Sequence, residues 1–199
     1  SSTYMVRPPW TPYGFIGVAG FFHNPQAQAP ATDLQGNPLP EAGEWVKLRP
    51  LGTEGQNGGL DPTDANHGIK KYSTFQVAIP FGVGVRFKLM PELDLAAEFG
   101  FRYTFTDYLD DVSKNYVGLD KLNSPLAQAM SYRTNELPAA DRPANTVDSG
   151  IPGVFVVPGY GHEFPSNNRG SSKDNDLYMV TSIRLSYILK ATYHRPKFR

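Results

Sequence analysis

The sequence predicts an all-β protein whose antiparallel strands form an up-and-down transmembrane β-barrel. Three observations lead to this fold class: long segments that alternate apolar with small or polar residues, connections of very unequal length, and a β-class composition. The chain has 19 glycine, 18 proline, 12 phenylalanine and 11 tyrosine residues, and long helical periodicity is missing. Its 199 residues are expected to form a single domain.

The first expected strand covers residues 13–22, which are apolar on both faces and include three glycines. The second covers residues 72–89. Within it, residues 75–89 read FQVAIPFGVGVRFKL, with a large apolar residue at every odd position and a small, polar or charged residue at every even position. A period of two over fifteen residues is typical of a strand with two unlike faces.

The third and fourth expected strands cover residues 93–106 and 177–190. In the third, the odd positions from Leu93 to Phe105 are apolar, whereas the even positions include Glu98 and Arg102. In the fourth, leucine, methionine, isoleucine and tyrosine lie on one face, and serine and arginine lie on the other. Both segments are therefore predicted to continue the same two-faced sheet.

The connections between these strands alternate in length. Met90, Pro91 and Glu92 form a tight turn, whereas residues 24–71 and 108–175 are expected to be long loops. Short periplasmic turns and long extracellular loops are typical of outer-membrane barrels. The sequence therefore predicts a multi-pass barrel in the outer membrane of a Gram-negative bacterium, with both loops extracellular and the C-terminus periplasmic.

A soluble sandwich would also alternate, with its apolar face inward. Strand length favours the barrel, because globular strands run about five or six residues, whereas about 9–11 tilted residues cross a bilayer. The apolar face is then expected to contact lipid, and the opposite face, rich in small residues, is expected to line a narrow interior. Since four strands cannot close a barrel, we expect this chain to be the C-terminal half of an eight-stranded one.

The inward face is expected to carry a network of charges. Arg86 is expected within about one register step of Glu98, and Arg184 on the far side of the Glu98 strand. Because arginine stays charged, an unpaired guanidinium in such a site is unfavourable. We therefore predict that Glu98 bridges Arg86 or Arg184. The remaining cations, Arg102 included, should be neutralised by acidic residues on further strands.

Composition excludes several classes of function. The 19 basic and 19 acidic residues balance, which argues against a general nucleic-acid binder. The chain has no cysteine, hence no disulfide, thiolate nucleophile or cysteine–zinc site. An apolar run of about 18 residues, as a transmembrane helix needs, is missing. The four histidines lack zinc-site spacing, and no nucleophile elbow or phosphate loop is present, so no catalytic residue, metal or cofactor is expected.

Several stretches together resemble the PorG-type family of outer-membrane barrels. They are PYGFIGVAGFFHNPQA (12–27), PLGTEGQNGGLD (50–61), YSTFQVAIPFGVGVRFKL (72–89), FRYTFTDYLDDVSKNYV (101–117) and YHRPKF (193–198). The most specific motif is the loop formed by Thr106, Asp107, Tyr108, Leu109, Asp110 and Asp111. Two features depart from the family: its N-terminal half is missing from this sequence, and the second long loop is longer than expected.

The resemblance implies a non-enzymatic scaffold of the type IX secretion system, a machine for protein transport across the outer membrane that is linked to gliding motility in some bacteria. It implies contacts with outer-membrane lipid, with the lipoprotein and partner subunits of a periplasmic ring, and with the translocon barrel. Two alternatives stay open: an outer-membrane barrel enzyme acting on lipids, and a small porin-like or structural barrel outside the secretion system.

Two further segments invite a functional interpretation. Asp107, Asp110 and Asp111 suggest a cation site, but the pattern favours a solvated loop start, with these carboxylates at the N-terminus of a helix near residues 108–116. The apolar stretch IPGVFVVPGYG (151–161) is expected to pack against the molecule's own loops rather than against a partner. For the basic residues 194–199, a contact with a ring subunit is not favoured.

Overall fold

The computed structural model describes residues 8–142, 144–158, 167–171 and 173–189. The chain divides into two compact units. One comprises residues 1–20, 77–104 and 177–199, and the other comprises residues 21–76 and 105–176. The sequence pattern predicted one domain and gave no sign of this division. Among the described residues, no helix combines the length and hydropathy needed to cross a membrane.

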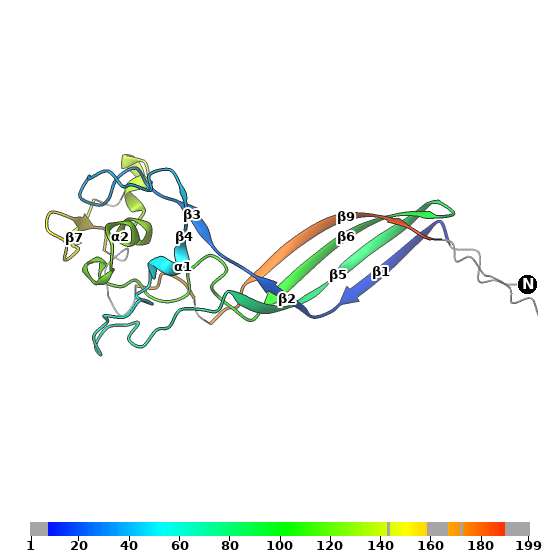
Figure 1. Cartoon of the computed structure of the whole chain (residues 1–199), viewed down its shortest axis with the longest axis horizontal. Helices are drawn as coiled ribbons and strands as arrows, with labels where there is room; N and C mark the ends of the chain where they lie inside the picture. The colour runs from blue at the N-terminus through cyan, green and yellow to red at the C-terminus, as the bar shows by residue number, and fades with distance from the viewer. Residues whose placement is uncertain (1–7, 143, 159–166, 172, 190–199) are drawn as a thin grey trace, which may run out of the picture. The chain divides into compact units, whose positions relative to one another are not determined.

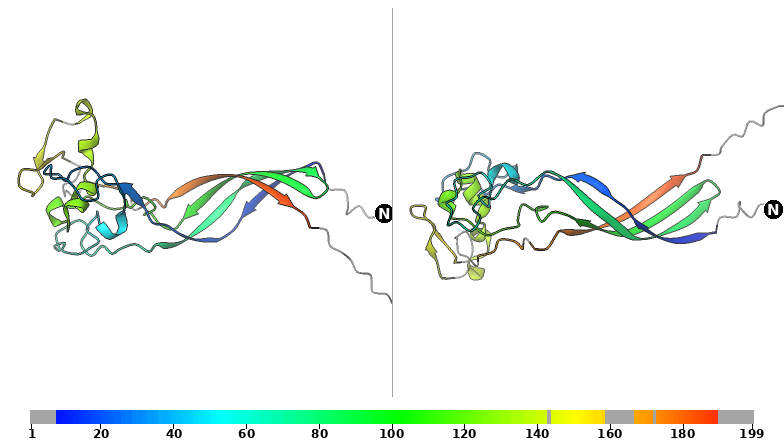
Figure 2. Two further views of the ribbon diagram at one scale, coloured as in Figure 1. Left: turned by 45° about the horizontal axis from the view of Figure 1, so that its top comes forward. Right: turned by 90° about the horizontal axis from the view of Figure 1, so that it is seen from below.

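The first unit is built on an antiparallel sheet. Its long strands are β1 (Trp10–Ile16), β5 (Phe75–Met90), β6 (Leu93–Thr104) and β9 (Leu177–Tyr187), in the order β1-β5-β6-β9, and the short β2 (Ala19–Phe22) also pairs with β5. Figure 1 shows the long strands side by side, and Figure 2 shows how the sheet twists. The prediction of an antiparallel β-fold with little helix is thus confirmed, and the two residues between β5 and β6 form the predicted tight turn.

The first expected strand, residues 13–22, is interrupted in the structure. β1 ends at Ile16, which lies opposite Phe81, and β2 resumes the strand at Ala19. The interruption faces Pro80, whose oxygen accepts a hydrogen bond from the Gly17 N–H at 2.9 Å. Because proline has no N–H to donate in return, the regular ladder stops at this position.

The other strand bounds differ from the prediction at their ends. β5 begins at Phe75 instead of residue 72, because the Ser73 hydroxyl bonds both the N–H and the C=O of Phe75 and competes with the ladder. β6 ends at Thr104 instead of residue 106, and β9 ends at Tyr187. Residue 190, where the fourth strand was expected to end, lies outside the described residues.

The register places the apolar rows of the four long strands on one face. Val83 of β5 lies between Gly14 of β1 and Phe99 of β6, and Phe99 in turn lies opposite Thr181 of β9. We call this the apolar face. Its exposed large side chains include Trp10, Ile16, Val77, Phe81, Val83, Phe87, Phe99, Tyr103, Leu177, Met179, Ile183, Leu185 and Tyr187.

The opposite face, which we call the polar face, explains two glycines of the alternating pattern. The Phe15 ring lies over Gly82 and Gly100, and a Cβ at either position would stand 2.8 Å from its Cζ atom. Only glycine therefore lets the ring lie against the backbone of β5 and β6. The other principal side chains of this face are Thr11, Tyr13, Arg86, Lys88, Asp94, Ala96, Glu98, Arg102, Thr104, Tyr178, Val180, Ser182, Arg184 and Ser186.

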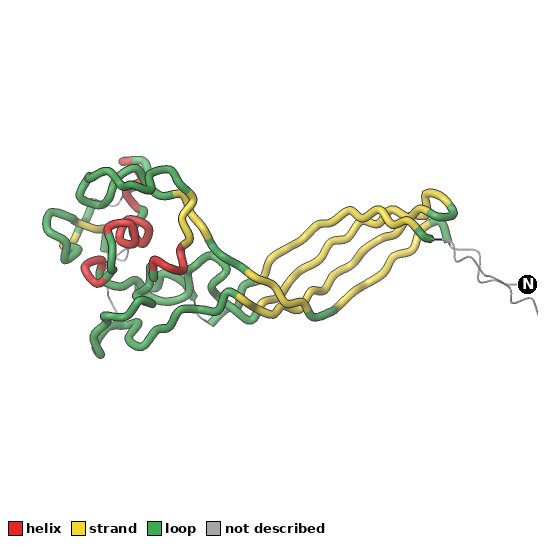
Figure 3. Tube along the Cα trace, viewed as in Figure 1, coloured by secondary structure: helices red, strands yellow, loops and turns green. Residues whose placement is uncertain are grey.

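The second unit contains the segments expected to be long loops, 24–71 and 108–175, and that description is corrected. Short elements run through both segments (Figure 3). They are β3 (Gln26–Gln28), β4 (Trp45–Lys47), α1 (Leu48–Leu51), η2 (Leu119–Lys121), α2 (Pro125–Ser131), η3 (Thr134–Glu136), η4 (Ala139–Asp141), β7 (Val147–Asp148) and β8 (Phe155–Val156). Most are too short to show a hydrophobic period, so the sequence pattern did not reveal them.

The α2 helix shows how local sequence builds this unit. The Ser124 hydroxyl accepts a hydrogen bond from the Ala127 N–H at 3.1 Å, and Pro125 occupies the first helical turn, where no N–H is needed. The buried side of the helix joins a hydrophobic core. Its buried members are Val117, Leu119, Leu122, Ala127, Tyr132, Ile151, Val154 and Val156.

Candidate functional site

The polar face of the sheet holds the first set of predicted site residues. Glu98 lies directly opposite Gly84 and Ser182, so that Arg86 and Arg184 lie one register step away on either side. Arg184 Nη2 reaches Glu98 Oε2 at 3.0 Å. The predicted bridge to Glu98 is therefore made by Arg184.

Two further donors reach Glu98. The Tyr13 hydroxyl donates to Oε1 at 2.6 Å, and the Ser182 hydroxyl donates to Oε2 at 3.1 Å. Sequence analysis missed Tyr13, because the first strand is apolar on both faces and gives no period to assign its tyrosine to one of them. The register supplies that assignment by pairing Tyr13 with Gly84.

The remaining predicted cations have different surroundings. The Arg86 Nε atom lies 4.0 Å from Asp94 Oδ2, so Arg86 is paired with Asp94 instead of Glu98. Arg102 lies opposite Pro80 and Tyr178, and no ion pair of Arg102 is found among the residues that the structure describes.

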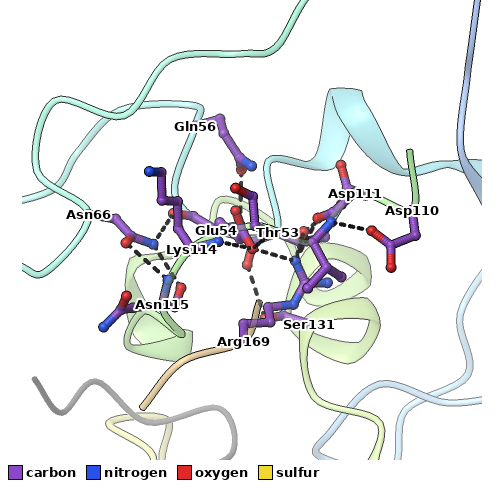
Figure 4. Close-up of polar contacts among 12 residues, drawn as sticks. Thr53, Glu54, Gln56, Asn66, Asp110, Asp111, Lys114, Asn115, Ser131 and Arg169 are labelled. Atoms are coloured by element: carbon purple, nitrogen blue, oxygen red, sulfur yellow. Dashed lines mark hydrogen bonds and ion pairs between the residues drawn. The ribbon is translucent and has the colours of Figure 1, made fainter. Parts of the chain in front are cut away.

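The second candidate region is a buried polar cluster in the second unit, shown in Figure 4. Its centre is Asp111, which is fully buried and adopts a left-handed backbone conformation with φ of 71°. Its carboxylate accepts hydrogen bonds from Thr53 Oγ1 at 2.6 Å and from the Tyr72 hydroxyl at 2.7 Å. Aspartate tolerates this backbone region better than most residues do.

Glu54 forms the other anionic part of the cluster and is also fully buried. Its Oε1 atom accepts the backbone N–H groups of Ser113 at 2.9 Å and Lys114 at 3.0 Å. Arg169 Nη1 lies 3.4 Å from the same oxygen and donates to the Asp111 carbonyl at 2.9 Å. One guanidinium thus joins the two acidic residues (Figure 4).

Amide side chains extend the cluster to neighbouring segments. Asn66 Nδ2 donates to the carbonyls of Glu54 at 3.0 Å and Asn115 at 2.8 Å, while its Oδ1 accepts the Asn115 N–H at 3.3 Å. Ser131, at the end of α2, donates to the carbonyl of Thr53 at 3.1 Å. The cluster therefore ties together five stretches that are far apart in the sequence.

Burial dominates the electrostatics of this cluster. It raises the pKa of the Glu54 carboxyl, although the Ser113 N–H and Arg169 oppose the shift. Burial likewise raises the pKa of Asp111 against the hydrogen bonds from Thr53 and Tyr72. For both carboxyls, removal from water outweighs the stabilising contacts.

Tyr108 belongs to an aromatic stack beside these acids. The centre of its ring lies 4.7 Å from that of Tyr72, with 15° between the two planes. The His23 ring also stacks on Tyr72, with 5.5 Å between the ring centres. Burial raises the pKa of the Tyr108 hydroxyl. Burial also raises the pKa of the Tyr72 hydroxyl, so both tyrosines are neutral at physiological pH, and Tyr72 donates to Asp111.

The predicted motif loop contributes to this cluster unevenly. Asp111 and Tyr108 belong to it, Thr106 is buried, Asp110 is exposed, and the Leu109 N–H donates to Asp176 at 3.0 Å. The expected helix near residues 108–116 is not present, and the expectation that these aspartates are solvated is wrong for Asp111. The chain reverses here through turns closed by side chains such as Thr106 Oγ1, which accepts the Tyr108 N–H at 3.2 Å.

The burial of Asp107 is intermediate between that of Asp111, which is buried, and that of Asp110, which is exposed. Asp107 is half-buried, and burial raises the pKa of its carboxyl, with repulsion from Asp176 and Asp110 adding to the shift. Within the described ranges, no group of three or more histidine, aspartate or glutamate side chains is arranged to hold a metal ion.

The prediction that residues 151–161 pack against the molecule's own loops is confirmed for residues 151–158, which the structure describes. Ile151, Val154 and Val156 belong to the hydrophobic core of the second unit, while residues 159–161 lie outside the described residues. The basic residues 194–199 also lie outside them. The packing of this stretch is therefore internal to the second unit.

This geometry limits what the buried cluster can do. Thr53, Glu54 and Asp111 are fully buried, so their hydroxyl and carboxylate groups are closed to a substrate from solvent. Every contact described above is made within the protein. The cluster therefore acts as a cross-link that holds the segments of the second unit together.

Comparison with known proteins provides one match. Residues 63–123 match a family described as a domain of unknown function (DUF6089). That range includes Asn66, Tyr72 and Asp111 of the buried cluster as well as β5 and β6. No match was found among curated proteins or among solved structures.

Proposed function

We propose that the sheet is part of the wall of a transmembrane β-barrel in the outer membrane of a Gram-negative bacterium. The observation that carries this proposal is the apolar face, which extends over all four long strands. Ile183 is 79% exposed and Val83 is 63% exposed, although both lie in the interior of their strands. A contiguous apolar surface of this extent needs a partner, and lipid meets that need.

Strand length supports the same proposal. β5 has 16 residues and β6 has 12, whereas a tilted strand crosses the bilayer with about 9–11. A soluble sandwich would need a second sheet of comparable length over the apolar face. The strands described outside this sheet, β3, β4, β7 and β8, have only two or three residues each.

Within that membrane, the chain is proposed to serve as a non-enzymatic scaffold of the type IX secretion machinery. The support for this role is the resemblance to the PorG-type family, which is distributed over most of the sequence. In this arrangement the turn at residues 91–92 and the C-terminus are periplasmic, where the ring lipoprotein and ring subunits bind. The segments of the second unit are extracellular, and its buried cluster gives them a fixed structure outside the membrane.

A topology experiment tests the membrane proposal. A protease-cleavable tag inserted at Gly58, which is exposed and where an added Cβ would meet no atom within 4 Å, should be cut on intact cells. The same tag after Arg199 should be cut only once the outer membrane is breached. Cleavage of the C-terminal tag on intact cells would contradict the proposed orientation.

Purification in mild detergent tests the scaffold role separately. The tagged protein should recover the ring lipoprotein and ring subunits from outer membranes, and its deletion should stop secretion of cargo of the machine. Normal secretion by the deletion strain, with the protein still located in the outer membrane, would reject the scaffold role and leave the membrane assignment intact.

A further inference from the structure

The polar face of the sheet carries an excess of positive charge. Its charged side chains comprise four cations and two carboxylates, which leaves an excess of two cations. They are Arg86, Lys88, Arg102 and Arg184 against Asp94 and Glu98.

Neither Asp94 nor Glu98 is placed to balance the charge of Arg102 on β6. Glu98 already accepts hydrogen bonds from Tyr13, Ser182 and Arg184, and Asp94 lies beside Arg86. Arg102 is four residues from Glu98 on the same strand, which corresponds to roughly 13 Å along an extended chain. Glu98, held by its three other donors, makes no ion pair with Arg102 in the described structure.

The neighbours of Arg102 on the polar face are uncharged. Across the strands lie Pro80 and Tyr178, and along β6 lie Gly100 and Thr104. Arg102, Arg184 and Glu98 line a hollow of about 400 Å³ on this face, and because Glu98 is paired with Arg184, one cation of the hollow is left to be balanced. Because a guanidinium keeps its charge, this hollow favours an anionic partner.

The edges of the sheet show what form that partner takes. In the described structure the strand order ends at β1 on one side and at β9 on the other. The outer edge of each of these strands carries backbone N–H and C=O groups that need partners, and in a membrane such groups must pair with another strand.

We propose that the polar face is covered by further antiparallel strands that pair with the outer edges of β1 and β9 and place a carboxylate against Arg102. This inference rests on the proposed membrane barrel. A second copy of the same sheet fits less well, since it would bring two cationic faces together. A lipid phosphate could neutralise Arg102 but would leave both edges unpaired.

A zero-length cross-link tests the contact. The full-length Arg102→Lys protein, in outer membranes isolated from the cells that make it, is treated with a water-soluble carbodiimide. The carbodiimide adds to a carboxylate and activates it. An amine in direct contact then attacks the carboxyl carbon, so that an amide forms and the carbodiimide leaves as a urea. Mass spectrometry should find the new lysine joined to an aspartate or glutamate outside residues 8–189 of this chain.

The chain offers matched controls for this experiment. Arg102→Gln has no amine and should lose this cross-link, whereas Lys88, directly opposite Asp94 in the register, should form its own cross-link in both variants. Arg102→Glu, which would set two carboxylates against each other, should reduce the fraction of protein in the folded, heat-modifiable form on cold gels more than Arg102→Gln does.

Two results would overturn the inference. One is a cross-link from Arg102→Lys to an acidic residue within residues 8–189, in the same chain or in a second copy of it. The other is the absence of any new cross-link while that between Lys88 and Asp94 forms. Isolation of the membranes comes first, so a protein missing from that fraction would refute the proposed membrane location, not the identity of the partner.

Discussion

The substitution Val83→Arg separates a lipid-facing sheet from a water-facing one. Val83 lies in the middle of β5 and is 63% exposed in the isolated sheet. If this surface faced water, the new arginine would change the free energy of unfolding by about 0.5 kcal/mol or less. If the surface faces lipid, an arginine near the bilayer midplane should cost roughly 2–4 kcal/mol. The expected loss in the folding equilibrium is then roughly 30- to 700-fold.

A depth control uses the same face and the same substitution. Tyr187 is 67% exposed, and it is six residues along β9 from Thr181, which lies level with Val83 through Phe99. Six residues correspond to roughly 20 Å along a strand. With a strand tilt of about 40° this places Tyr187 roughly 15 Å from the midplane, at the edge of the apolar band. Tyr187→Arg should therefore cost only about 0–1 kcal/mol.

Both variants can be compared with the unchanged protein by denaturant titration of outer-membrane vesicles, with the folded fraction read from its mobility on cold gels. We expect a lower denaturant midpoint for Val83→Arg and a nearly unchanged one for Tyr187→Arg. Equal midpoints for the two variants, or a Val83→Arg protein as stable as the parent, would refute a lipid-facing assignment of this face.

Three further predictions concern packing and the buried cluster. Gly82→Ala should lower the free energy of unfolding in the same titration by roughly 1–3 kcal/mol, because its Cβ would stand 2.6 Å from the Gly100 Cα atom. Asp111→Asn keeps a residue that tolerates the left-handed backbone but leaves a buried hydroxyl without an acceptor. It should therefore lower the stability of the second unit by about 1–3 kcal/mol, measured by resistance to proteolysis. The raised pKa of Glu54 means that the folded state binds a proton more tightly than the unfolded state. The second unit should gain stability as pH falls through that raised pKa and lose it as pH rises, and Glu54→Gln should flatten this dependence in proteolysis measured across pH.

The charge pairs of the polar face show how far the sequence pattern reaches. Alternation assigned Arg86, Glu98 and Arg184 to one face, and the tight turn set the register closely enough to limit the partners of Glu98 to two arginines. The choice between them depended on Asp94, which lies beside Arg86, and on the hydroxyl groups of β1 and β9 that surround Glu98. Pattern analysis ranks positions on a face but does not measure the distances between side-chain atoms.

By itself the sequence determined the two faces of β5, β6 and β9, because side chains alternate across a strand and the period is therefore visible in consecutive residues. Only the tertiary structure decided the second unit. Asp111 is fixed by Thr53, 58 positions earlier, and Arg169 reaches Thr53 across 116 positions. Contacts of this kind follow from the path of the whole chain through turns and short helices, so they leave no period in the segments that make them. The burial of Asp111 at the centre of the cluster is likewise decided by the path of the whole chain and not by its local sequence.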